Sequence, residues 1–281
     1  MKINQLDLFS GIGGFHLGFH QAGYKVNSHF SEIDKHAIAV YKNQFKDATY
    51  SGSVDTIRSE QLPNIDLITF GSPCQDFSIA GQRKGMQGDR SSLILEAIRL
   101  ISECRPRVFI WENVKGTFSS NGGEDFASIL QAFTNIGGYR LEWQLLNTSW
   151  LLPQNRERIY LVGYLGELPR NWRGVFPLIE PSGEDFKVEE PRAAVTKCLT
   201  ARGQEYHSGM QLLRESNGEY RNLTPIECER LQGFPDNHTA YGDYDGEVMP
   251  MTKTQRYKQC GNAVTVDVVQ AIAEKLKPLF K

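Results

Sequence analysis

Two side chains in this sequence could carry out covalent chemistry on a ring. Cys74 lies in the segment GSPCQ (71–75), directly after the apolar stretch 65–70. A thiolate is a strong nucleophile, so an exposed cysteine there could add to an electron-poor ring. Glu112 follows the apolar run VFIW (108–111), and its carboxyl group could hold or donate a proton near neutral pH. The alternative roles of Glu112 are a helix N-cap or a surface acid.

A glycine-rich turn could bring the backbone close to a ligand. Gly11, Gly13 and Gly14 follow the apolar stretch 3–9, and glycine permits a close approach and a tight turn into a helix. Glu32 lies 21 residues after Gly11, where a carboxylate can accept hydrogen bonds from ribose hydroxyls. The turn departs from GxGxxG because the next glycine is Gly18. An adenosine cofactor fits these features, and an ordinary turn between a strand and a helix is the alternative.

A pair of arginines stands in the segment QNRER (154–158). We expect a strand to run through this segment, with Arg156 and Arg158 leaving its opposite faces. One guanidinium would then point into a site while the other pairs outside it.

Strands and helices are expected to alternate, which predicts an α/β fold with a parallel or mostly parallel sheet covered on both faces. The expected strands are 3–9, 25–30, 65–70, 107–111, 139–147 and 158–164. One expected helix follows the glycine turn and ends near residue 23, and four more cover 34–44, 91–104, 124–135 and 265–276. A capping box predicts a further helix start at Thr224. In such sheets, ligands bind beyond the carboxyl ends of the strands. The glycine turn, Glu32, Cys74 and Glu112 lie at these ends.

Composition limits the classes of protein. The chain has 281 residues, 40% of them apolar, without a stretch of 18 apolar residues or a secretion signal, so we expect a cytoplasmic protein and no membrane contact. Residues 165–257 carry 15 acidic and 11 basic side chains, so nucleic acid contacts must be local. The cysteines form no CxxC pair, which argues against bound metal. We interpret Cys104, Cys198, Cys228 and Cys260 as packing residues with reduced thiols.

Six motifs occur in a characteristic order: DLFSGIGGFHLGF, GSPCQDFS, ENV, QNRER, RLQGFPD and QCGNAV. Over residues 5–164 and 195–276 they resemble the ordered motifs of the DNA (cytosine-5)-methyltransferases. The resemblance implies a Rossmann-like class I S-adenosylmethionine-dependent methyltransferase fold with a small irregular target-recognition region. The catalytic and cofactor-binding domain would be 1–164, completed by a C-terminal helix at 258–281. The target-recognition domain would be 165–257, with a shortened variable part near 166–195.

The resemblance also implies a reaction. A methyl group would pass from S-adenosylmethionine to C5 of a cytosine flipped out of double-stranded DNA, leaving S-adenosylhomocysteine. Cys74 would attack C6 of the base, and Glu112 would bond N3 and the amino group. Arg158 would orient this pair, and Arg156 completes the implied catalytic set.

The implied cofactor residues follow the first turn, the strand ends and the last motif. Phe9 would face the adenine, Ile33 would pack on it, and Glu32 would hold the ribose. The full implied set is Phe9, Ser10, Gly11, Ile12, Gly14, Glu32, Ile33, Val54, Gly71, Pro73, Leu93, Asn262 and Ala263. The glycine-rich stretch after Cys74 would contact DNA phosphates through Arg83, Lys84 and Arg90.

Two departures from the family pattern stand out. Ser53 replaces the acidic residue that commonly bonds the adenine amino group, and Asp55 is a candidate substitute. Only 56 residues separate Tyr164 from Arg221, which is short for a target-recognition region. A short or relaxed recognition sequence, a second subunit, or a weak enzyme would each explain this length, and we favour the first.

Competing functions follow from the same motifs. A nicotinamide-dependent dehydrogenase would share the glycine turn but has no use for GSPCQ with ENV. A transfer RNA cytosine-5 methyltransferase would use the same residues and is the nearer alternative. A non-catalytic homologue would normally lack Cys74 or Glu112. A restriction endonuclease is a candidate partner.

Overall fold

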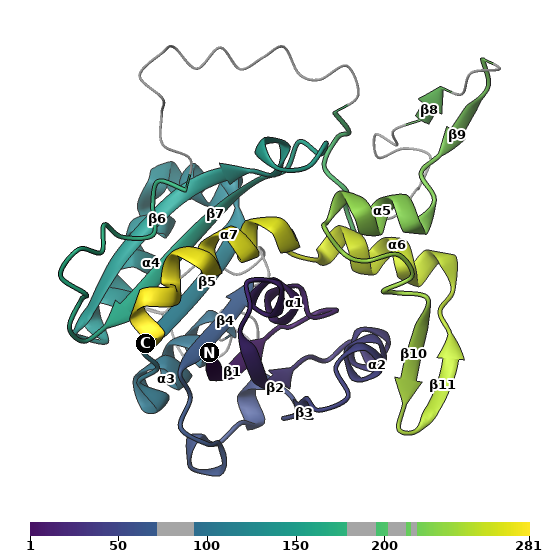
Figure 1. Cartoon of the computed structure of the whole chain (residues 1–281). Coiled ribbons are helices and arrows are strands. Elements are labelled where there is room, and N and C mark those ends of the chain that lie inside the picture. The colour runs from purple at the N-terminus through teal and green to yellow at the C-terminus, as the bar shows by residue number, and fades with distance from the viewer. Residues whose placement is uncertain (72–92, 179–194, 202–211, 215–217) are drawn as a thin grey trace.

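A computed structural model describes residues 1–71, 93–178, 195–201, 212–214 and 218–281. Its main strands are β1 (Lys2–Leu8), β2 (Lys25–Ser31), β3 (Thr49–Tyr50), β4 (Leu67–Gly71), β5 (Val108–Val114), β6 (Tyr139–Asn147) and β7 (Glu157–Leu165). They form one sheet in the order β3-β2-β1-β4-β5-β7-β6 (Figure 1). Neighbours from β3 to β5 pair in parallel, whereas β7 is antiparallel to both β5 and β6. The prediction of a mostly parallel sheet is confirmed.

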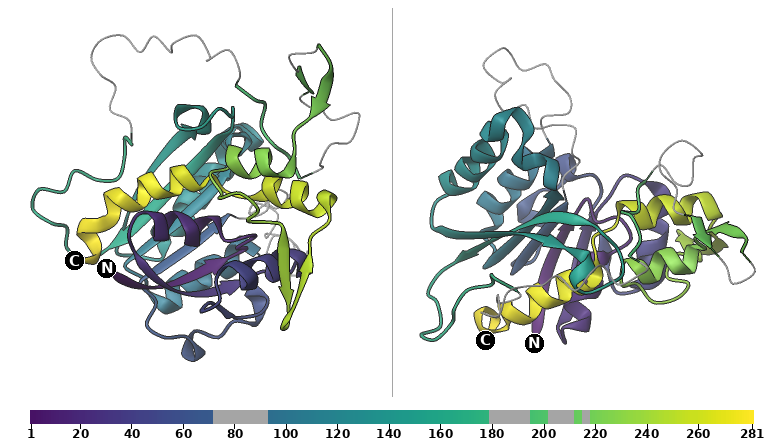
Figure 2. Two further views of the ribbon diagram at one scale, coloured as in Figure 1. Left: turned by 45° about the vertical axis from the view of Figure 1, so that its right-hand side comes forward. Right: turned by 90° about the horizontal axis from the view of Figure 1, so that it is seen from above.

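Helices cover both faces of this sheet. On one face lie α1 (Gly14–Gln21) and α7 (Val266–Leu276), with α2 (Lys35–Gln44) packed beside α1. On the other face lie α3 (Leu93–Cys104) and α4 (Glu124–Asn135), and Figure 2 shows α7 and these two helices on opposite sides. Phe19 and Val269 belong to the first apolar core, and Phe133 and Trp111 to the second. None of the helices in the described ranges is long and apolar enough to cross a membrane.

Gly18 explains why the glycine pattern departs from GxGxxG. A Cβ atom at this position would lie 2.5 Å from Cγ1 of Val269 in α7. Glycine therefore lets α1 pack closely against α7, and its role is in helix packing rather than in the turn that precedes α1.

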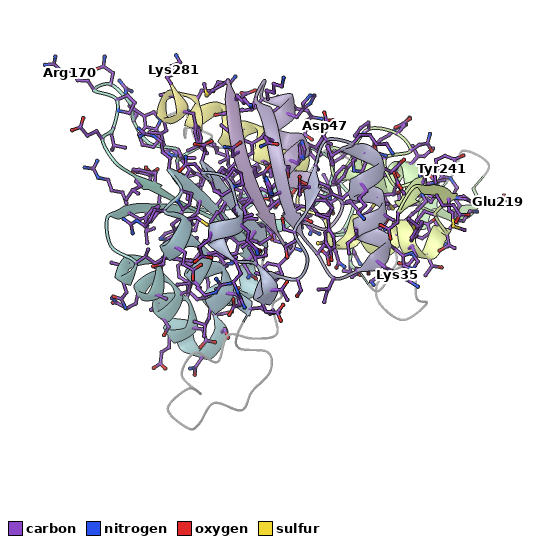
Figure 3. All side chains as sticks on the ribbon, turned by 90° about the horizontal axis from the view of Figure 1, so that it is seen from below. Lys35, Asp47, Arg170, Glu219, Tyr241 and Lys281 are labelled. Carbon is purple, nitrogen blue, oxygen red and sulfur yellow. The ribbon has the colours of Figure 1, made fainter. Side chains whose placement is uncertain are left out.

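A second group of elements lies beside one end of the sheet. It contains α5 (Pro225–Leu231), α6 (Lys253–Asn262), the hairpin β8 (Leu212–Arg214) with β9 (Tyr220–Asn222), and the hairpin β10 (Tyr241–Tyr244) with β11 (Glu247–Pro250). Figure 3 shows Tyr241 and Glu219 at the end of the molecule opposite Arg170. The β10–β11 hairpin packs along α2, where Lys42 pairs with Asp245 at 2.7 Å.

Most of these elements were predicted from local sequence signals. Asp34 caps α2 by accepting from the backbone N–H groups of His36 and Ala37, and the capping box of Thr224 and Glu227 begins α5. The prediction that the fourth strand ends at 111 is wrong, because β5 continues to Val114. The prediction of a C-terminal helix over 258–281 is wrong as a single element, because α6 ends at Asn262 and α7 begins only at Val266. The start of α6 at Lys253 and the β10–β11 hairpin were not expected from the sequence.

A buried carboxylate holds the second group of elements together. Glu229 in α5 is fully buried and accepts from the backbone N–H groups of Asn237 and Thr239, from the Thr239 hydroxyl, and from Arg256 of α6 at 2.9 Å. Removing one charge of such a buried pair leaves the other without compensation.

We expect Glu229→Gln to lower the free energy of unfolding by about 3–5 kcal/mol, the usual effect of breaking a buried ion pair. Asp236→Asn is the control, because Asp236 pairs with Arg230 on the surface and exposed pairs contribute little. Urea unfolding followed by circular dichroism measures both. Equal midpoints for the two variants would contradict this role of Glu229.

Asp7 lies under the first turn in a buried polar network. Thr69 donates to its carboxyl group at 2.7 Å and Tyr41 at 3.4 Å. Burial raises the pKa of Asp7 to about 8, although these two hydrogen bonds oppose the rise. The native protein therefore carries a proton on Asp7 at neutral pH that the unfolded chain releases.

This proton makes stability depend on pH. The unfolded carboxyl group titrates near 3.8 and the native one near 8, so its contribution to stability falls as the pH rises between those values. We expect Asp7→Asn to remove that part of the decline. Urea unfolding of the parent and of Asp7→Asn at about pH 5 and pH 8 tests this. The change in unfolding free energy between the two pH values is compared, and its difference between the two proteins reports Asp7, because they share all other titrating groups. An identical pH dependence would contradict it.

Candidate active site

A cavity of about 610 Å3 lies at the carboxyl ends of β1, β2, β4 and β5. The expected cofactor residues that line it are Phe9, Gly11, Ile12, Glu32, Ile33, Val54, Gly71, Leu93 and Asn262. Glu112, Arg156 and Arg158 line the same cavity. The two sets of side chains, which are far apart in the sequence, therefore share one space.

The glycine turn and Glu32 form one wall of this cavity. Gly11 has a φ of +54°, which favours glycine, and a Cβ atom there would meet nothing within 4 Å. Glu32 accepts hydrogen bonds from the backbone N–H groups of Gly11, Ile33 and Asp34 at 2.8–3.0 Å. Its carboxylate thus fixes the turn while it remains at the cavity surface, where a ligand hydroxyl can reach it.

Three other expected cofactor residues lie outside the lining of the cavity. They are Ser10, Gly14 and Ala263. Gly14 lies against the link between α6 and α7, since a Cβ atom there would come 2.6 Å from Cγ2 of Val264. The carbonyl of Ala263 accepts a hydrogen bond from Arg156 at 2.8 Å. Direct contact of these three residues with a cofactor stays a prediction.

Glu112 lies within β5, between two neighbouring strands. It pairs in register with Gly71 of β4 and with Tyr160 of β7, and its side chain is only 11% exposed. A Cβ atom at Gly71 would lie 3.1 Å from Oε2 of Glu112, so glycine leaves room for the carboxylate. The alternatives of a helix N-cap and a surface acid are therefore wrong for Glu112.

Arg158 on β7 forms an ion pair with Glu112. Its Nε lies 3.1 Å from Oε1 of Glu112, and both side chains are largely buried. Burial lowers the pKa of Arg158, but the charge of Glu112 and the Cys198 sulfur outweigh this effect and raise it. Oε1 of Glu112 is buried and makes no aligned hydrogen bond within the described ranges.

The prediction that the two arginines leave opposite faces is wrong. Arg156 precedes the start of β7, and both guanidinium groups border the same cavity; residues two apart on a strand would also share a face. Arg156 donates to the backbone carbonyls of Leu199, Gly261 and Ala263 at 2.8–3.3 Å. Its contacts hold the wall of the cavity together.

Cys198 differs from the other described cysteines. Its sulfur accepts from Arg156 at 3.5 Å and from Arg158 at 3.8 Å. Cys228 and Cys260 are buried in an apolar cluster, which fits their interpretation as packing residues. The described cysteines form no disulfide.

A further wall of the cavity was not found from the sequence. Residues 199–201 and the α6 residues Lys258, Gln259 and Gly261 form it. Gly261 permits the contact, because a Cβ atom there would lie 2.3 Å from the backbone of Thr200. Gln259 is the first residue of the motif QCGNAV and Lys258 precedes it directly, and this position was a signal that could have drawn attention to them.

Lys258 closes one side of the cavity through an ion pair with Asp34. Its Nζ lies 2.6 Å from Oδ2 of Asp34. Burial raises the pKa of Asp34, but the Lys258 ammonium and the capping N–H groups outweigh it and hold the pKa of Asp34 below its ordinary value. The pair joins α2 to α6 beside the cavity.

Several expected site residues lie outside the described part of the chain. They are Pro73, Cys74, Arg83, Lys84 and Arg90. Gly71 and Leu93, on either side of that stretch, both line the cavity. Ser53 lines it as well, whereas Asp55 does not.

Comparison with known proteins identifies the protein family of this chain. The family model for C-5 cytosine-specific DNA methylase matches residues 3–201 and 170–278. "Type II methyltransferase M1.ScrFI" of Lactococcus lactis subsp. cremoris is 35% identical over 98% of this chain and 78% of that protein. "Type II methyltransferase M.NlaX" of Neisseria lactamica is 33% identical over 97% and 95%. The structure of S. pombe Dnmt2 methyltransferase aligns with a TM-score of 0.71 at 22% identity, covering 99% of both chains.

The fold and the cavity define a methyltransferase with a Rossmann-like sheet. More narrowly, the chain belongs to the family of C-5 cytosine-specific DNA methylases. It is an enzyme that methylates C5 of cytosine in DNA.

Proposed function

We propose that the enzyme takes its methyl group from S-adenosylmethionine and delivers it to a cytosine flipped out of duplex DNA, with Cys74 as the nucleophile. The observation that carries this proposal is a single cavity, with the glycine turn and Glu32 on one wall and the Glu112–Arg158 pair on another. A methyl donor and an acceptor base must meet in one space, and this cavity offers it.

The cavity residues fit the cofactor. Ile33 is 79% exposed although it lines the cavity, and an apolar side chain so placed can cover an adenine ring. Glu32 offers carboxylate oxygens to ribose hydroxyls, and Gly11 leaves open space beside the turn. Phe9, Val54 and Leu93 supply apolar surface, as ligand cavities commonly do.

The proposed reaction assigns each step to a group of this chain. The Cys74 thiolate adds to C6, and the electron pair displaced from the C5–C6 bond makes C5 nucleophilic. S-adenosylmethionine, when bound, would supply an electrophilic methyl group to C5 and leave as S-adenosylhomocysteine. Glu112 holds the proton at N3 while the thiolate is attached, and Arg158 keeps that carboxyl group in place. Loss of the C5 proton to a base then expels the thiolate and restores the aromatic ring.

The target-recognition region is proposed to read a short or relaxed DNA sequence. The stretch 166–195 is acidic, so it offers few phosphate contacts. Arg83, Lys84 and Arg90 are proposed to supply them. A cognate endonuclease as partner and action in the cytoplasm, where bacterial DNA lies, belong to the same proposal. The chain is proposed to act alone, and a second subunit that supplies target recognition is the alternative.

Bisulfite sequencing of plasmid DNA treated with the purified chain and S-adenosylmethionine tests the proposal. We expect 5-methylcytosine at positions that share a short sequence. A matched reaction with transfer RNA tests the alternative acceptor. Methylated transfer RNA with unmodified plasmid would overturn the proposed duplex substrate, and absence of product from both would overturn the proposal that the chain acts alone.

A further inference from the structure

Gln259 on α6 combines deep burial with a carboxamide that has no partner. The residue lines the cavity and is 6% exposed. Within the ranges that the structure describes, neither Oε1 nor Nε2 of Gln259 makes a hydrogen bond. Buried polar groups in native proteins nearly always have partners, and an unpaired one costs free energy. Gln259 therefore brings an unused donor and an unused acceptor to the wall of the cavity.

The neighbours of Gln259 on α6 have assigned contacts. Lys258 pairs with Asp34, and Cys260 is buried in the apolar cluster shared with α5. Gln259 and Asn262 are three residues apart, which places them on the same side of the helix, and both line the cavity. Gln259 thus adds an unused donor and an unused acceptor to the wall that Asn262, an expected cofactor residue, also lines.

The ligand group must offer both an acceptor and a donor. The methionine part of S-adenosylmethionine carries a carboxylate and an ammonium group, and these match the two atoms of a carboxamide. Glu112 and Arg158 already supply charged groups for the base, and Glu32 lies where the ribose is expected. Among the described side chains that line the cavity, the Lys258 ammonium is paired with Asp34, whereas the carboxamide of Gln259 has no partner.

We propose that Gln259 binds the amino-acid end of S-adenosylmethionine, with Nε2 donating to its carboxylate and Oε1 accepting from its ammonium group. The inference rests on the proposed function, because it takes S-adenosylmethionine as the methyl donor. Under this proposal, Gln259 favours binding of a cofactor that retains its amino-acid group.

Ligand truncation tests this directly. S-adenosylhomocysteine carries the amino-acid group, whereas 5′-methylthioadenosine has the same nucleoside and sulfur without it. By isothermal titration calorimetry, Gln259→Leu is expected to weaken S-adenosylhomocysteine binding roughly ten- to a hundredfold, as for lost hydrogen bonds to charged groups. The affinity for 5′-methylthioadenosine is expected to stay unchanged.

Gln255→Leu is the matched control. Gln255 stands one turn earlier on α6 and also has a buried Oε1 without a partner in the described ranges, but it does not line the cavity. We expect this variant to bind both ligands as the parent does. A selective loss of S-adenosylhomocysteine affinity in Gln255→Leu would overturn the assignment to Gln259.

Thermal unfolding separates binding from folding. Leucine removes an unpaired buried amide at similar volume, so the melting temperature of ligand-free Gln259→Leu is expected to equal or exceed that of the parent. Its rise on adding S-adenosylhomocysteine is expected to be smaller. Equal weakening of both ligands, or normal ligand binding with slower DNA methylation, would overturn the inference. A parent protein that binds neither ligand would instead overturn the proposed function.

Discussion

The Cys74→Ser enzyme is expected to form no measurable 5-methylcytosine while it binds S-adenosylmethionine almost as tightly as the parent does. A serine hydroxyl does not ionise near neutral pH, whereas a few per cent of a free thiol is already thiolate. Without addition at C6, C5 of the cytosine remains too weak a nucleophile to take the methyl group. The affinity is retained because the thiol is not proposed to touch the cofactor.

Two measurements check this result. Transfer of labelled methyl groups to DNA measures turnover, and calorimetry measures cofactor binding. DNA that contains 5-fluorocytosine adds a direct test, since fluorine cannot leave C5 as a proton does and the covalent adduct persists. We expect an adduct stable to denaturation with the parent and with the control Cys104→Ala, but not with Cys74→Ser. A large loss of cofactor affinity in Cys74→Ser, or a persisting adduct, would contradict the assignment.

The layered sheet was predictable because its signals are local. Apolar stretches of strand length alternate with amphipathic segments, and Asp34 and Thr224 mark helix starts through contacts within a few residues. The end of β5 was missed for the opposite reason. Glu112 and Asn113 are polar and resemble the start of a loop, yet strand pairing with β4 and β7 keeps them in the sheet.

The second group of elements carried weaker signals. The segment of α6, KTQRYKQCGN, has little apolar periodicity, and its structure depends on the Thr252 cap and on burial of Cys260 against α5. The β10–β11 hairpin did have a signal. Asp245 and Gly246 form the Asp-Gly turn that favours tight hairpins, and both have a positive φ.

Only those parts of the candidate site that belong to a single sequence motif could be predicted. Strand ends placed Glu32 and Glu112 at one edge of the sheet, because parallel strands bring their carboxyl ends together. The wall made by residues 199–201 and α6 depends on contacts between distant segments, such as Gly261 with Thr200. Neither spacing nor composition reports such contacts, so the place of Gln259 in the cavity wall became visible only in the structure.

The Glu112→Gln enzyme is expected to methylate DNA roughly a hundredfold more slowly or worse, since general acid–base catalysis contributes at least that much. Glutamine keeps the shape of the side chain but cannot hold and release the N3 proton in the same way. It also removes the negative partner of Arg158, which lies 3.1 Å from Glu112 and is largely buried. The effect is expected in kcat, because the proton is needed only while the thiolate is attached to the ring.

Glu157→Gln is the matched control for this loss. Glu157 lies next to Arg158 in sequence but pairs with Lys115 on the surface at 3.0 Å, so its variant is expected to keep the parent rate. Adduct formation with 5-fluorocytosine DNA then locates the step. If Glu112 stabilises the ring during addition, the adduct forms more slowly in Glu112→Gln by about the same factor as methylation. An adduct that forms at the parent rate would place the action of Glu112 after addition, and a full rate of methylation would remove Glu112 from the mechanism.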